Sequence, residues 1–365
     1  MTNLNQKIAI VQDALVVSAG TEKVVLHLSN LFPQASIYTS VYLPECTYPD
    51  FREKTVITLP SPFKVKNERQ FKALFPLWYL GFIRLDLSGF DIVISSANYL
   101  AKFIHTPSST VHISYIQNPF RFLWKPESYS PSSLPYPRPI IAAIKLLFPL
   151  LRKIDLRATC RIKNVIANSQ NMADQIRKIY GLEAEIIYPP VDIDQFYLSN
   201  QPEDYYLCVG RLISHKRVDL AIQACNRLQR KLLIAGDGLE RPTLERLGGE
   251  DIHILGRISD SQLKQLYANC RGLIFPSDED FGLVPVEAQA SGRPVIAFRS
   301  GGVLETVIES ETGIFFSEQN VDSLVEAITQ FERMDFDPQR IRQNAMRFDH
   351  TQFESKFRAY VDRFT

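Results

Sequence analysis

The chain has 365 residues, with 41 Lys plus Arg against 40 Asp plus Glu, and a net charge of +1 at pH 7. This balance argues against a dedicated nucleic-acid binder, because neutralising phosphates needs a surplus of basic residues. An apolar share of 45% excludes a wholly disordered chain, and the length predicts about two domains.

The first half of the chain alternates short β-branched runs with segments of helical period. A polar N-terminus without a signal-peptide pattern precedes a buried strand at residues 7–11. A loop is expected to follow and to end at residues 19–22, before a helix that runs to about residue 31. A long helical segment is expected over residues 138–163. Further strands are expected at residues 36–40, 91–95, 111–116 and 165–168.

The same alternation restarts in the second half and ends at about residue 320, after which the chain reads as helical. Strands are expected at residues 205–209, 231–235, 252–255, 272–275 and 294–297. Strands buried on both faces and joined by helical crossovers form a parallel sheet. Two such series predict an α/β fold with two Rossmann-like, doubly wound domains.

The domain boundary is expected at Pro189 and Pro190, because two consecutive prolines hold the backbone extended and cannot continue a helix. This divides the chain into domains at residues 1–188 and 189–345. The remaining residues, 346–365, are expected to form a helix that packs back on the first domain.

An acidic stretch at residues 275–288 follows a predicted strand, at the strand end where open α/β sheets bind ligands. Glu279 is expected in a loop and Glu287 about one turn into the next helix. A carboxylate at that place can accept hydrogen bonds from the hydroxyls of a sugar or a ribose. The residues expected to open the helix, whose free N–H groups attract anions, are Phe281, Gly282 and Leu283.

A basic stretch at residues 209–217 also leaves a predicted strand and enters a helix. Gly210 lets the backbone approach a ligand, and Arg211 and Lys216 can both reach a phosphate. A basic helix start with a surface lysine is the alternative interpretation. Cations at a helix N-terminus oppose the helix dipole, so we expect an anion between these two side chains.

Together the two stretches resemble the retaining glycosyltransferases of family 4, over nearly the whole chain and most strongly from residue 165 to 313. That family has the GT-B architecture, in which two Rossmann-like domains face each other across a cleft. The chain is most similar to the bacterial subgroup that adds mannose to O-antigen and exopolysaccharide intermediates. The resemblance implies a metal-independent hexosyltransferase with no cofactor, a GDP-mannose donor, and a lipid-linked or growing glycan as acceptor.

The resemblance also implies roles for the motif residues. Glu279 and Glu287 fall on the family's Glu-x7-Glu motif, which places the first by the donor sugar's hydroxyls and the second on the donor ribose. Arg211 and Lys216 would stabilise the leaving diphosphate, an electrostatic task. Gly20 would let its loop approach the diphosphate, and Gly236 lies in a loop that matches the family's nucleotide side. The loop at Arg257 and Ile258 would hold the base, largely by its backbone.

Gln117 departs from the family pattern, because relatives usually have a His there that contacts the donor sugar. An amide can donate and accept hydrogen bonds but cannot take up a proton. Front-side attack, in which the leaving phosphate helps to deprotonate the acceptor, would tolerate this change. The nearby His112 alternates within a strand, which indicates a structural role.

Several alternatives stay open. They are a UDP-sugar-dependent enzyme of the same family, a non-catalytic glycan- or nucleotide-sugar-binding module suggested by Gln117, a sugar-nucleotide epimerase, and a glycogen-type glucosyltransferase. Asp278 and Asp280 form an Asp-x-Asp pair, which binds a metal in another glycosyltransferase architecture. Here the pair lies inside the Glu-x7-Glu motif, where relatives need no metal.

The segment at residues 138–163 holds seven basic residues and one acid, Asp155, among Ile, Leu and Phe. Apolar residues beside Lys and Arg suit a membrane interface, and an apolar run at residues 71–85 adds to this pattern. Core helices with snorkelling cations are the alternative. No stretch reaches the roughly 20 apolar residues of a membrane span. We therefore expect a cytoplasmic protein with peripheral contact at the inner face of the plasma membrane, and an acceptor side near Arg121, Trp124 and Lys125.

Overall fold

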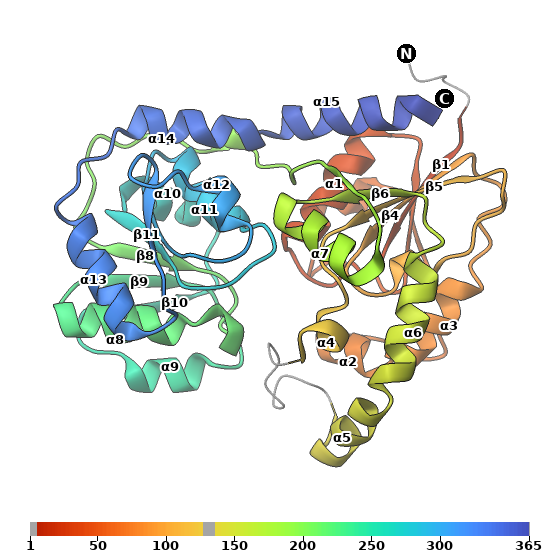
Figure 1. The fold of residues 1–365 in the computed structure, drawn as a ribbon, viewed down its shortest axis with the longest axis horizontal. Helices are drawn as coiled ribbons and strands as arrows, with labels where there is room; N and C mark the ends of the chain where they lie inside the picture. The colour runs from red at the N-terminus through yellow and green to blue at the C-terminus, as the bar shows by residue number, and fades with distance from the viewer. Residues whose placement is uncertain (1–5, 127–135, 365) are drawn as a thin grey trace. The chain divides into compact units, whose positions relative to one another are not determined.

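A computed structural model describes residues 6–126 and 136–364 of the chain (Figure 1). By its internal contacts the chain forms two compact units. The first comprises Met1–Pro190 and Thr351–Thr365, and the second comprises Val191–His350. The boundaries therefore fall at residues 190 and 350, where the sequence suggested 188 and 345.

The first unit is built on a seven-stranded sheet in the order β3-β2-β1-β4-β5-β6-β7, and all its pairings are parallel. Every residue of β1 and β4 is buried, because helices cover both faces of the sheet. The strands are β1 (Ile8–Gln12), β2 (Ser36–Thr39), β3 (Val56–Thr58), β4 (Ile92–Ala97), β5 (Val111–Ile116), β6 (Asn164–Ala167) and β7 (Glu185–Ile186).

The helices of the first unit have recognisable start and stop signals. Helix α7 begins after Ser169, whose hydroxyl accepts from Met172 N, and ends at Gly181 in the left-handed region with φ 67°. Helix α15 contributes Phe353 and Phe357 to the core, where both rings contact Tyr115. The helices are α1 (Gly20–Leu31), α2 (Glu68–Ala73), α3 (Phe75–Ile83), α4 (Arg121–Trp124), α5 (Arg138–Leu146), α6 (Phe148–Thr159), α7 (Gln170–Tyr180) and α15 (His350–Val361), with 3-10 turns η1 (Pro49–Glu53), η2 (Ala101–Phe103) and η8 (Asp362–Phe364).

The long helical segment expected over residues 138–163 is two helices rather than one. Pro149 lies in the first turn of α6, where its missing N–H costs no hydrogen bond, and the chain breaks at Leu147 just before it. Across residues 6–126 and 136–364, no helix combines the length and the apolar character that crossing a membrane requires.

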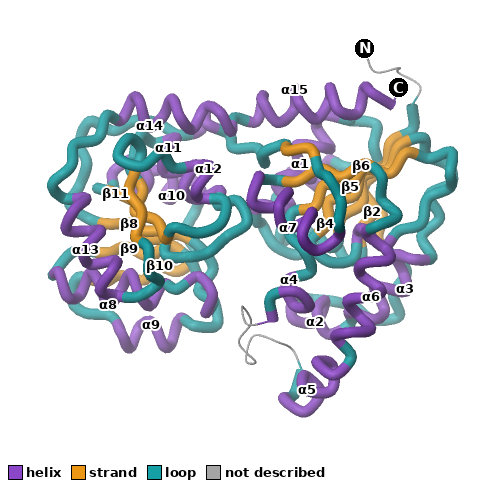
Figure 2. Tube along the Cα trace, viewed as in Figure 1, coloured by secondary structure: helices purple, strands orange, loops and turns teal. Residues whose placement is uncertain are grey.

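The second unit is a six-stranded parallel sheet in the order β10-β9-β8-β11-β12-β13 (Figure 2). The chain fills one side of this sheet from β8 to β10 and then the other from β11 to β13. The direction in which successive strands are added to the sheet therefore reverses between β8 and β11. This is the topological switch point, where such sheets bind ligands. The strands are β8 (Tyr206–Val209), β9 (Leu232–Ala235), β10 (Ile252–Gly256), β11 (Gly272–Phe275), β12 (Val295–Phe298) and β13 (Gly313–Phe316).

Two helices of the second unit, α8 and α13, bury apolar faces in the same core cluster. Helix α10 starts with a capping box, in which the Ser259 and Gln262 side chains each bond the other residue's backbone N–H. The helices are α8 (Val218–Leu228), α9 (Arg241–Leu247), α10 (Asp260–Asn269), α11 (Leu283–Ala290), α12 (Val303–Thr306), α13 (Val321–Phe331) and α14 (Pro338–Ala345), with 3-10 turns η5 (Ile193–Gln195), η6 (Ser214–Lys216) and η7 (Met346–Phe348).

The chain enters and leaves the second unit at adjacent points. Val191 N donates to Phe348 O at 3.0 Å, and His350 N donates to Val191 O at 3.0 Å. The two ends of the unit are thus joined by main-chain hydrogen bonds of the kind that link neighbouring strands.

Candidate active site

Lys216 and Glu279 meet at the switch point of the second sheet. The Lys216 Nζ donates to Glu279 Oε1, which also accepts from Ser277 Oγ at 3.0 Å. Lys216 follows β8 and Glu279 follows β11, and these two strands are neighbours. The side chains are 17% and 23% exposed, so the ion pair is partly buried but still reached by solvent.

The environment of Lys216 differs from the one its sequence suggested. Lys216 lies in the turn η6, and α8 begins only at Val218, after Arg217 in the left-handed region with φ 51°. The stretch leaves β8 and enters α8 as the sequence suggested, but Lys216 lies in the turn ahead of the helix, and the negative charge facing it is the Glu279 carboxylate. Arg211 lies exposed earlier in the same loop.

A pair of glycines holds the backbone at Glu279. Gly302 N donates to Glu279 O at 2.8 Å. A Cβ on Gly301, whose φ is +71°, would lie 2.2 Å from Glu279 O, and a Cβ on Gly302 would lie 2.4 Å from Asp280 O. Only glycine fits this close approach at either position. The sequence analysis missed this support, although two consecutive glycines shortly after the strand β12 were a visible signal.

Glu287 is the fifth residue of α11, as the sequence suggested. Its Oε2 accepts from the hydroxyl of Tyr267 at 2.8 Å. Tyr267 is fully buried, and its burial and the nearby Glu287 carboxylate hold the pKa of its hydroxyl well above the usual value, so it acts as a donor. Glu287 itself is half-buried. Nothing in the spacing of the sequence pointed to Tyr267.

The residues at the start of α11 have different roles: some pack in the core, and others set the backbone geometry. Gly282 caps the helix with φ 88°, and Leu283 is its first residue and half-buried. Phe281 precedes the helix, and its buried ring packs edge-on against Phe348 at 5.5 Å. The Phe281 side chain is therefore part of the core, which leaves only its main chain to face a ligand.

Glycines also connect the loops that follow the neighbouring strands β8, β9 and β10. Gly210 N donates to Ala235 O at 3.0 Å, and Gly236 N donates to Gly256 O at 2.9 Å. A Cβ on Gly236, whose φ is +151°, would lie 1.9 Å from Gly210 O. The three loops thus form one main-chain layer, which continues into the exposed Arg257 and the half-buried Ile258.

Two predicted site residues, Gln117 and Gly20, belong to the first unit. Gln117 is buried just after β5, where its Nε2 donates to Ser96 Oγ at 2.7 Å and its main-chain oxygen accepts from Asn168 Nδ2 at 2.9 Å. Gly20 was expected in a loop, but it is the first residue of α1, with Ala19 as the capping residue.

Sequence models of two families match the chain. "Glycosyl transferases group 1" matches residues 192–348, and "Glycosyltransferase Family 4" matches residues 18–195. The chain belongs to glycosyltransferase family 4. The family named from the two acidic and basic stretches is thereby confirmed, and the protein is a glycosyltransferase.

Two individual relatives share 30% of their residues or fewer with this chain over the aligned regions. The chain is 26% identical over 321 residues to the O-antigen chain mannosyltransferase RfbU of Salmonella typhimurium, an alignment covering 79% of this chain and 84% of that protein. It is 30% identical over 190 residues to a D-inositol 3-phosphate glycosyltransferase of Mycobacteroides abscessus, covering 45% of this chain and 43% of that protein.

Solved structures match the fold over the whole length. Sucrose-phosphate synthase from Thermosynechococcus elongatus superposes with a TM-score of 0.73 at 19% identity, covering 98% of this chain and 99% of that one. Anabaena Alr3699/HepE in complex with UDP and glucose gives a TM-score of 0.71 at 18% identity, covering 98% and 100%. The GT-B fold class predicted for this glycosyltransferase is confirmed.

The acidic pair around Glu279 has protein partners of its own. Asp278 Oδ1 accepts from Ser300 Oγ at 3.1 Å, and Asp280 is buried. Within the part of the chain that the structure describes, no three His, Cys, Asp or Glu side chains gather as metal ligands.

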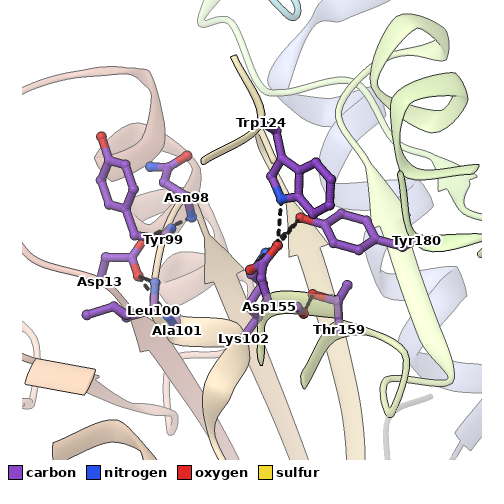
Figure 3. Close-up of polar contacts among 10 residues, drawn as sticks. All are labelled: Asp13, Asn98, Tyr99, Leu100, Ala101, Lys102, Trp124, Asp155, Thr159 and Tyr180. Carbon is purple, nitrogen blue, oxygen red and sulfur yellow. Dashed lines mark hydrogen bonds and ion pairs between the residues drawn. The ribbon is translucent and has the colours of Figure 1, made fainter. Parts of the chain in front are cut away.

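Asp13 is a further residue that the sequence analysis missed. It directly follows β1, and its carboxylate accepts four backbone N–H groups at 2.6–2.9 Å, from Asn98, Tyr99, Leu100 and Ala101 (Figure 3). Burial raises the pKa of Asp13, while the four N–H donors favour its charged form. The carboxylate fixes the loop that follows β4, next to the Ser96 that Gln117 contacts.

Trp124, which was expected on the acceptor side, is tied into the core of the first unit. Its Nε1 donates to Asp155 Oδ2 at 2.8 Å, and Tyr180 donates its hydroxyl to the same oxygen at 2.8 Å (Figure 3). The Lys102 Nζ lies 2.7 Å from Asp155 Oδ1, and both side chains of this pair are at most 1% exposed. The network holds α4 against α6 and α7.

Proposed function

We propose that this glycosyltransferase is a retaining, metal-independent hexosyltransferase that moves mannose from GDP-mannose to a lipid-linked or growing polysaccharide acceptor. The observation that carries the proposal is the Lys216–Glu279 pair at the switch point, with Glu287 on the following helix. The mannose donor is supported by the similarity to RfbU, which is named as a mannosyltransferase and is aligned over 84% of its length.

The Lys216–Glu279 pair is the element that a donor diphosphate would rearrange. Lys216 would turn its ammonium group from the carboxylate to the diphosphate, with the exposed Arg211 as a second cation. Both charges would then stabilise the negative charge that develops on the leaving phosphate. Glu279, released from the lysine, would accept hydrogen bonds from the donor sugar's hydroxyls.

The nucleoside would bind along α11 and the glycine layer. Tyr267 occupies one oxygen of Glu287, which leaves the other oxygen for a ribose hydroxyl. Gly210 and Gly236 have no side chains, so the diphosphate could approach the main chain there. The loop at Arg257 and Ile258 would hold the base by its backbone.

The transfer step requires no protein base at Gln117. In front-side attack the acceptor oxygen bonds the anomeric carbon on the face from which the phosphate leaves, and the acceptor proton passes to the leaving phosphate oxygen. The Gln117 amide, held by Ser96, would then orient the sugar by hydrogen bonding only.

The acceptor side would contact the inner face of the plasma membrane through α5 and the start of α6. Leu146, Leu147 and Leu150 are 82%, 52% and 56% exposed, and the exposed Lys145 and Lys153 lie among them. Exposed leucines next to lysines match the boundary between acyl chains and anionic headgroups, where a lipid-linked acceptor is found.

A second candidate function is transfer from a UDP-sugar. It is favoured by the structural neighbour HepE, which was solved with UDP and glucose. Recognition of the base by backbone groups would leave little trace in the side chains of either kind of enzyme.

The test is nucleotide release from GDP-, UDP- and ADP-sugars, with and without a bacterial lipid extract, in the presence and absence of EDTA. Acceptor-dependent release of GDP from GDP-mannose supports the proposal, and release of UDP selects the second candidate. The anomeric configuration of the product, read by NMR, tests retention. No release from any donor with folded protein contradicts both functions and favours a binding module, for which Gln117→His is the variant to examine.

A further inference from the structure

The first unit contains a pocket of about 270 Å³ away from the residues assigned above. It lies between α3, the segment after η2, the start of β5 and the end of α6. Its apolar wall includes Tyr79, Ile83, Phe103 and Ile154. The pocket lies at the beginning of β5, and Gln117 follows the end of that strand. The pocket and the predicted site residue therefore lie at opposite ends of the strand.

The polar lining of the pocket is basic. Arg157, in the last turn of α6, and Arg161, just after that helix, both line it together with His105 and Thr106. No carboxylate is among the described residues that line the pocket. Lys102 also reaches it, but its charge is balanced by Asp155.

The two arginines lack acidic partners within residues 6–126 and 136–364. Arg161 Nη1 lies 2.9 Å from His105 Nε2, and because a guanidinium only donates, that nitrogen accepts and Nδ1 carries the ring proton. The C-terminal end of α6 favours a cation at Arg157. It also favours Arg161, two residues beyond the helix, but it does not account for the convergence of both guanidinium groups and an imidazole on one pocket.

We propose that this pocket binds a phosphate group. Guanidinium groups match phosphate oxygens in pairs, and the Thr106 hydroxyl offers a further donor. The volume lies just below the roughly 300 Å³ at which pockets for small molecules begin, so the group is small. The apolar wall can accommodate a carbon chain attached to the phosphate, as in a lipid headgroup. A free phosphate would use the polar lining alone.

The first arm of the test measures inorganic phosphate binding by isothermal titration calorimetry. The background protein carries Arg211→Gln and Lys216→Gln, because the candidate donor site also attracts phosphate. Adding Arg157→Gln and Arg161→Gln is expected to weaken binding by roughly tenfold or more. The matched control, Lys64→Gln with Lys66→Gln, removes the same charge from exposed lysines of the same unit outside the pocket and is expected to change binding less than about twofold.

A second variant separates the pocket from a general surface charge. Ala158 lines the pocket, so Ala158→Phe fills it without changing any charge and is expected to weaken binding as strongly as the arginine variant. Melting temperatures establish that each variant is folded. Full binding by folded Ala158→Phe would show attraction by surface charge alone and would overturn the proposal.

The second arm uses vesicles of phosphatidylcholine with and without phosphatidic acid, in a sedimentation assay on the same variants. Loss of binding in both pocket variants identifies a lipid phosphate as the source, whereas loss confined to the calorimetric arm identifies a free phosphate. Undiminished binding by the folded arginine variant in both arms overturns the proposal.

Discussion

Two of the chain's lysine–carboxylate pairs lie in opposite surroundings. Lys102 and Asp155 lie inside the first unit at no more than 1% exposure, and the Asp155 carboxylate also accepts from Trp124 and Tyr180 (Figure 3). Lys216 and Glu279 lie on loops of the second unit at 17% and 23% exposure. Both pairs join a lysine to a carboxylate, but the first pair is sealed from solvent, whereas the second is partly buried and open to solvent.

This difference decides what each pair can do. A charge buried with its partner cannot leave it, because the remaining ion would lose both its partner and water. A charge at the surface can exchange its partner for a ligand at little cost, because water solvates both groups during the exchange. The sealed pair therefore holds α4, α6 and α7 together, and the open pair is suited to binding a diphosphate.

The largest expected effect is on the sealed pair. Lys102→Met leaves the Asp155 carboxylate buried without its cation and is expected to lower the free energy of unfolding by about 3–5 kcal/mol. Chemical denaturation measures this. The double variant Lys102→Met with Asp155→Asn keeps an oxygen acceptor for Trp124 and Tyr180 without the charge, and should recover roughly half of the loss or more. A double variant no more stable than the single one would contradict this explanation.

The same substitution at the open pair should act on the reaction rather than on stability. Lys216→Met is expected to reduce sugar transfer by roughly 100- to 1000-fold, because it removes a donor from the developing charge. Its free energy of unfolding should change by less than about 1 kcal/mol. Initial rates with saturating donor, together with a denaturation curve, test both statements. A variant that unfolds as easily as Lys102→Met would remove the contrast between the pairs.

A smaller effect is expected from the hydroxyl that positions Glu287. Tyr267→Phe deletes one hydrogen bond to this carboxylate, worth about 1.5–3 kcal/mol, and should raise the KM for the donor roughly tenfold with little change in kcat. Tyr205→Phe is the matched control, because the Tyr205 hydroxyl donates to the main-chain oxygen of Leu266 instead. Equal effects of the two substitutions would argue against a role for Tyr267 at the nucleotide.

The smallest expected effect concerns a group that burial keeps uncharged. Burial lowers the pKa of His112 from 6.5 to about 4. Between these two pH values the imidazole is protonated in the unfolded chain and neutral in the folded chain. Stability then falls between about pH 6.5 and pH 4 and levels off below that range. Between pH 7 and 5.5 the wild-type protein should lose about 1 kcal/mol more than His112→Gln. Denaturation at both pH values, with the exposed His253→Gln as control, measures the difference; parallel losses would contradict it.

How well the sequence predicts a strand depends on where the strand lies. The central strands β5 and β11 match the predicted residues completely. In β11 every residue is buried, and burial on both faces requires a short run without polar side chains. The strands β3, β7 and β13 were not predicted. All three lie at sheet edges, and β3 and β7 are only three and two residues long, which leaves a weak pattern. The edge strand β10, of five residues, was predicted.

The candidate site shows the same division between local and tertiary information. Lys216, Glu279 and Glu287 were found because each follows a strand in a distinctive motif. Tyr267 and Asp13 were not, because their partners lie 20 residues or more away along the chain and only the fold brings them together. Phe281 shares its motif with the ligand-facing residues, and only the structure assigns its ring to the core.

The main-chain hydrogen bonds between Val191 and residues 348 and 350 make the second unit a closed insertion. Its two ends are neighbours, so in the gene the unit behaves as a cassette inside the coding region of the first. Recombination could exchange such a cassette, and with it the predicted nucleotide-side loops, while the surrounding sequence stayed intact. The arrangement offers a route by which enzymes of this kind could combine one first unit with different second units.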